Sequence, residues 1–69
     1  MDGPQTVDEY QRLISEVIKK QITLLGSNIA LERARNVAGL IVSDDGTVTN
    51  ISGAPREVLQ KVIDEYFVF

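Results

Sequence analysis

The stretch from residue 37 to residue 53 constrains the fold of this 69-residue chain more than any other part of it. Two short runs rich in β-branched residues, 40–42 and 47–51, flank the acidic turn sequence Asp44-Asp45-Gly46. An Asp-Gly turn between such runs is a strong local signal for an antiparallel hairpin. Because a helical pattern lies on each side, the sequence predicts an α+β fold in the order helix, helix, strand, strand, helix.

The hairpin has two possible registers. A two-residue turn would pair Leu40 with Ile51, whereas a three-residue turn with a bulge would pair Val42 with Val48. The second register directs an apolar pair toward the helices, and we favour it for that reason. Such cross-strand pairs contribute only about 0.2–1 kcal/mol each, so they decide between the registers weakly.

Helix start and stop signals divide the rest of the chain. The first helix begins at a capping box that opens with Thr6, and Gly26 supplies a residue suited to ending it. A short second helix is predicted over 29–36, and Pro55 suits the first position of a third. The alternative is one long helix over 6–36, at a cost of about 1 kcal/mol for the internal glycine.

Apolar side chains recur at helical spacing in the first and third helices and form a wide stripe on each. The stripes consist of Tyr10, Leu13, Ile14, Val17, Ile18, Ile22 and Leu25 in the first helix, and Val58, Leu59, Val62, Ile63, Tyr66 and Phe67 in the third. We expect both stripes to pack in the core. Outside the first stripe, Glu16 and Lys20 are spaced for an i,i+4 ion pair.

The length of the chain predicts a single small domain over 1–69, with a flexible N-terminus over 1–5. A domain of this size buries a modest fraction of its surface and is marginal alone. The chain has no Cys and no His, so disulfides, thiolate zinc sites and the usual neutral-pH base are excluded. We therefore expect helix packing or a partner chain to complete the domain.

A second copy of the chain is the partner that the sequence favours. A two-stranded hairpin has two edges to satisfy, its first strand is apolar on both faces, and the end of the chain is rich in aromatic residues. We predict a homodimer in which two hairpins join into a four-stranded sheet, or the helices pack across the twofold axis. The predicted interface residues are Leu40, Ile41, Val42, Val48, Ile51, Tyr66, Phe67 and Phe69.

The leading functional prediction is a small protein-interaction or oligomerisation module, a regulatory accessory domain that binds itself or another protein. No residue pattern predicts catalysis, a cofactor or a metal site, and Asp44-Asp45-Gly46 is interpreted as a turn. The alternatives are a DNA-associated regulator that uses Arg33 and Arg35, and a domain that senses a small apolar ligand between the third helix and the hairpin.

Charge and hydropathy bear on these alternatives. The net charge of −3 argues against nucleic-acid binding, which requires clustered Lys and Arg. No apolar run approaches the roughly 18 residues that suggest a membrane span, and no signal peptide is visible, so we expect a cytoplasmic protein with no membrane partner. The chain ends within an apolar stripe, so a fragment of a longer protein is a further alternative.

Overall fold

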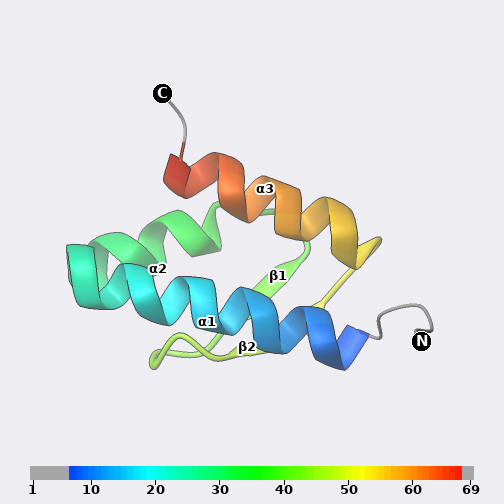
Figure 1. Cartoon of the computed structure of the whole chain (residues 1–69), viewed down its shortest axis with the longest axis horizontal. Coiled ribbons are helices and arrows are strands. Elements are labelled where there is room, and N and C mark those ends of the chain that lie inside the picture. Colours follow the sequence, from blue (N-terminus) through cyan, green and yellow to red (C-terminus); the bar gives the residue numbers. More distant parts are fainter. Residues whose placement is uncertain (1–6, 68–69) are drawn as a thin grey trace.

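The computed structural model describes residues 7–67. Three helices and a two-stranded antiparallel hairpin follow one another in the predicted order, which confirms the α+β fold (Figure 1). The elements are α1 (Val7–Leu25), α2 (Ser27–Arg35), β1 (Leu40–Val42), β2 (Val48–Ile51) and α3 (Pro55–Phe67). The predicted capping residue Thr6, the predicted flexible segment 1–5 and the interface candidate Phe69 lie outside the described residues.

Gly26 separates the first two helices, as predicted. Its φ of 88° lies in the left-handed region that glycine adopts without strain, and its N–H donates to the carbonyl of Ile22 at 2.8 Å. The alternative of one uninterrupted helix is therefore wrong. The second helix begins at Ser27 and ends at Arg35, so the prediction of 29–36 was displaced at both ends by one or two residues.

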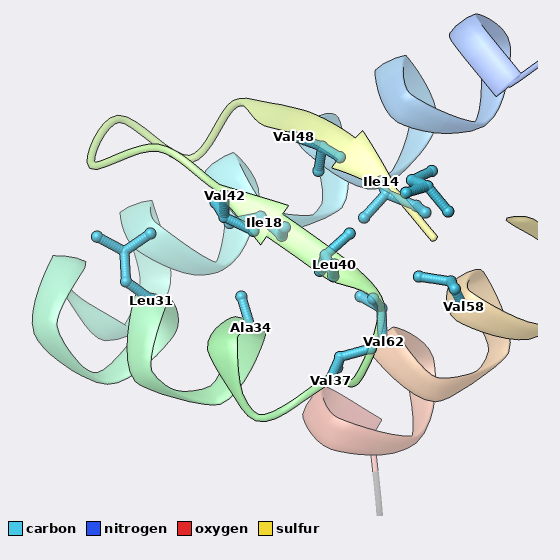
Figure 2. Packing of buried hydrophobic residues seen from close by; sticks show 11 residues of the cluster. Ile14, Ile18, Leu31, Ala34, Val37, Leu40, Val42, Val48, Val58 and Val62 are labelled. Carbon is cyan, nitrogen blue, oxygen red and sulfur yellow. The ribbon is translucent and has the colours of Figure 1, made fainter. Parts of the chain in front are cut away.

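The apolar core lies between the three helices and one face of the hairpin. Figure 2 shows side chains from the hairpin directed toward those of the helices behind it. The buried apolar residues are Ile14, Ile18, Ala30, Leu31, Ala34, Val37, Leu40, Val42, Val48, Ile51, Val58 and Val62. Because every helix and both strands contribute, the core joins all five elements without a second chain.

The hairpin combines both predicted registers. Near the turn Val42 pairs with Val48, and at the far end Leu40 pairs with Ile51. The register shifts between these pairs, where Thr49 is the extra residue of a bulge. In a regular strand Val48 and Ile51 would point to opposite faces, because side chains alternate. The bulge turns both toward the core, opposite the two apolar residues of β1.

Each edge of the hairpin is bonded to a helix of the same chain. The backbone N–H of Val48 in β2 donates to the hydroxyl of Ser15 in α1 at 2.8 Å. On the other strand, the carbonyl of Val42 accepts a bond of 3.4 Å from the guanidinium of Arg35 in α2. Helix α1 packs on β2 and α2 packs on β1. One polar group at each edge of the hairpin is therefore paired within the chain, and the joining of two hairpins stays a prediction.

Candidate interaction surface

Four of the predicted interface residues lie inside the core of the chain. Leu40, Val42, Val48 and Ile51 are all buried against the helices. Ile41 is different, because its side chain is 57% exposed on the outer face of β1. The expectation that both faces of this strand are covered does not hold within the single chain, since the helices lie on one side of the hairpin only.

The aromatic residues at the end of α3 have two different environments. Tyr66 is half-buried, and its hydroxyl donates to the backbone carbonyl of Ala30 in α2 at 2.6 Å. Burial raises the pKa of this phenol above its ordinary value. The neighbouring Phe67 is 47% exposed. Tyr66 therefore joins α3 to α2, whereas Phe67 offers apolar surface.

The exposed large apolar side chains define the candidate site. Within the described residues they are Val7, Leu13, Leu24, Leu25, Ile29, Ile41, Ile63 and Phe67. On α1, Leu13 is two residues before Ser15, which bonds the hairpin, and Leu24 is two residues after Ile22, which packs on the core. Two residues correspond to about 200° around a helix, so both leucines face away from the hairpin.

The other helices place apolar side chains in similar positions. In α2, Ile29 is about 200° from the buried Leu31. In α3, Ile63 and Phe67 are one helical turn apart. Glu65 lines a depression beside the segment that leads to β1. Because Ile63 is about 200° around the helix from Glu65, it faces away from that depression.

We call this set, Leu13, Leu24, Ile29, Ile63 and Phe67, the helical face. Helix α1 packs on both other helices, and Figure 1 shows α1 crossing in front of the hairpin with α2 and α3 above it in the view.

Sequence reasoning assigned Leu13, Leu25 and Ile63 to core stripes, and the structure corrects this because all three are exposed. Phe67, which was predicted both for a core stripe and for an interface, is exposed as well. Helix α1 buries Ile14, Ser15, Ile18 and Gln21, and Leu13 lies about 100° beyond Ile14 on the side away from Ser15. A stripe that spans nearly half of the helix circumference was the signal that a second surface exists. Leu24 and Ile29 were not chosen as interface residues at all.

The hairpin turn is stabilised by polar groups of its own. Asp45 accepts from the hydroxyl of Ser43 at 2.5 Å and from the backbone N–H of Thr47 at 2.9 Å. These hydrogen bonds lower the pKa of the Asp45 carboxyl to about 2. In residues 7–67, no group of three or more Asp, Glu, His or Cys side chains is arranged to hold a metal ion. The bonds of Asp45 are those of a turn residue.

The two arginines of the DNA-binding alternative point to different elements. The guanidinium of Arg33 donates to the backbone carbonyl of Glu65 in α3 at 3.4 Å. That of Arg35 forms an ion pair with Asp44 at 2.9 Å, beside the hairpin. The two side chains therefore do not form a joint cationic surface for a nucleic-acid groove, and no observation favours this alternative.

The space between α3 and the hairpin is occupied by the core. Val58 and Val62 of α3 are buried in one cluster with Leu40 of β1 (Figure 2). The depression on the neighbouring side of α3 is lined by charged groups of Lys61, Asp64 and Glu65 together with the connection over 36–38. Neither place resembles the enclosed apolar pocket that a small apolar ligand needs.

Comparison with known proteins adds no further constraint. No family model, curated protein or solved structure matches the chain. Among the helices of residues 7–67, none combines the length and hydropathy that a membrane span requires.

Proposed function

We propose that this chain is a small protein-interaction module whose contact surface is the helical face. The observation that carries the proposal is the separation of two kinds of surface. The hairpin edges are bonded to helices of the same chain, whereas large apolar side chains remain exposed on all three helices. Large apolar side chains left exposed on a small protein are the groups from which contact sites are built.

The chemistry of the helical face fits a protein partner. The helical face consists of aliphatic side chains and one phenylalanine. The charged residues Glu16 and Lys20 are exposed on α1, the helix that carries Leu13 and Leu24. An apolar centre bordered by charged groups is the usual composition of a protein–protein interface. Helical apolar residues at intervals of one and three turns also suit the packing of a partner helix.

Site-specific photo-crosslinking tests this proposal irrespective of the identity of the partner. A photoreactive phenylalanine analogue is placed at Leu24 or Ile63 of the full chain in the cells that express it. Ile41 is the matched control, because it is also apolar and its exposure of 57% lies between those of Leu24 and Ile63, but it is on the hairpin. We expect a defined adduct, with a second copy or with another protein, from Leu24 and Ile63. An adduct from Ile41 alone would contradict the proposal.

A further inference from the structure

We infer that the partner of the helical face is a second copy of this chain, bound through antiparallel pairing of two α1 helices. This inference rests on the proposed function and names the partner of the same surface. It differs from the predicted joining of two hairpins, because the strands remain within each copy and the twofold axis crosses α1.

The distribution of charge along α1 favours an antiparallel pair. Its first ten residues carry the carboxylates Asp8, Glu9 and Glu16 and the guanidinium of Arg12, a net charge of −2. The remaining nine carry two lysines and no carboxylate, a net charge of +2. Two antiparallel copies in the register given below overlap over residues 12–25, so that Glu16 of each lies near Lys20 of the other, whereas a parallel pair in register would place Glu16 against Glu16 and Lys20 against Lys20.

The apolar residues of the outer side of α1 have a self-complementary spacing. The exposed Leu13 and Leu24 lie about three helical turns apart, and between them stand the exposed Lys20 and Val17, which is half-buried against the core. An antiparallel pair centred between residues 18 and 19 brings Leu13 of each copy against Leu24 of the other. A twofold axis forms this contact twice, as an isologous interface requires.

The same register satisfies the charged residues beside the seam. It brings the stem of Lys20 over Val17 of the other copy, with its ammonium within reach of Glu16 of that copy. Glu16 and Lys20 were predicted to pair within one helix, but in residues 7–67 no ion pair joins them, and both side chains are exposed. The charges that border the seam are thus available for contacts between copies.

Charge reversal measured by sedimentation equilibrium of the full chain tests this arrangement. We expect the chain to dimerise reversibly below about 1 mM. Glu16→Lys alone and Lys20→Glu alone should each weaken the dimer about tenfold, because every ion pair occurs twice. The double variant should restore the dimer to within about threefold of the original. Glu32→Lys, an equal charge change on the exposed side of α2, is the matched control and should leave the affinity unchanged.

Several results would overturn the inference. They are a chain that stays monomeric at 1 mM, or a double variant no stronger than the single ones. The second result would mean that the charge order of α1 serves only its helix dipole. Circular dichroism confirms that each variant is folded. If the chain is monomeric but Leu24 and Ile63 crosslink to a different protein, the inference fails while the proposed function stands.

Disulfide trapping tests the direction of the helices separately. The chain contains no Cys, so introduced thiols report on their own positions alone. A mixture of Leu13→Cys and Leu24→Cys chains should form a disulfide faster than either variant by itself. Faster bonding between two Leu13→Cys chains would indicate a parallel pair and would overturn the proposed register.

Discussion

Ser15 performs two structural tasks with one hydroxyl group. It donates to the carbonyl of Gln11 at 2.6 Å within α1 and accepts from the N–H of Val48 at 2.8 Å. The side chain is 7% exposed, so water cannot readily replace it. A hydroxyl inside an apolar helix face thus connects the helix to the edge of β2. The partner of Ser15 is 33 residues away in the chain, so no local sequence pattern predicts this bond.

Ser15→Ala should lower the free energy of unfolding by about 1–3 kcal/mol, because it leaves the amide of Val48 buried without an acceptor. Thr23→Ala is the control on the same helix. Its exposed hydroxyl bonds only the carbonyl of Lys19, so a change within about 0.5 kcal/mol is expected. Urea denaturation followed by circular dichroism measures both. Equal effects of the two substitutions would show that the bond to Val48 contributes nothing.

Tyr66 predicts a dependence of stability on alkaline pH. Folding raises the pKa of its phenol, mainly through burial, so the folded chain holds this proton more tightly than the unfolded chain. The contribution of the neutral phenol is therefore complete below the ordinary pKa of about 10 and is lost as the pH rises through the folded pKa.

Tyr66→Phe should remove this alkaline contribution and, at neutral pH, cost about 0.5–1.5 kcal/mol for the lost bond to Ala30. Urea unfolding of both chains at pH 8 to 11 measures the effect. Because the lysines titrate in both chains, the difference between the two stability profiles reports on Tyr66 alone. Parallel stability profiles over that range would contradict the assigned environment of Tyr66.

At the scale of elements, single turn and helix-start residues predicted the structure better than the apolar periodicity of the helices did. Gly26 and Pro55 correctly marked the end of α1 and the start of α3, because turns and first helical positions impose backbone conformations that few residues adopt. The stripes were less informative, since periodicity shows that Leu13 and Ile63 are apolar but not whether another element covers them. The bulge at Thr49 depends on packing against α1, which no local pattern encodes.

Gly39 closes the open end of the hairpin and yields a prediction for this element. Its carbonyl accepts from the N–H of Ser52 at 2.6 Å, and a Cβ at residue 39 would lie 2.6 Å from the backbone oxygen of Ser52. Gly53 has nearly the same φ, 86° against 87°, but open space around its Cβ position.

Gly53→Ala should therefore cost about 1–2 kcal/mol, for the left-handed backbone alone. Gly39→Ala should cost at least about 1 kcal/mol more, because the backbone of β2 has to move. Thermal or urea unfolding of the two variants gives the difference directly. A Gly39→Ala chain as stable as the Gly53→Ala chain would mean that the close approach of the two strands is not maintained.

At the scale of the whole molecule, the structure changes the reason for expecting a partner. The sequence argument expected so small a chain, with no disulfide or metal site, to form a twofold dimer in which two hairpins join or the helices pack across the axis. Instead, the amide of Val48 in β2 and the carbonyl of Val42 in β1 are bonded to α1 and α2 of the same copy. The surface that we propose for association is the helical face.

Amide hydrogen exchange of Val48, measured by NMR on a dilute sample, tests this account most directly. Dilution to about 10 μM removes the proposed dimer without breaking any bond inside the chain. We predict that the Val48 amide stays protected at least about a hundredfold in the monomer and loses that protection in Ser15→Ala. Exchange at the rate of an unfolded chain, with protection that appears only as concentration rises, would contradict the account and favour pairing between hairpins.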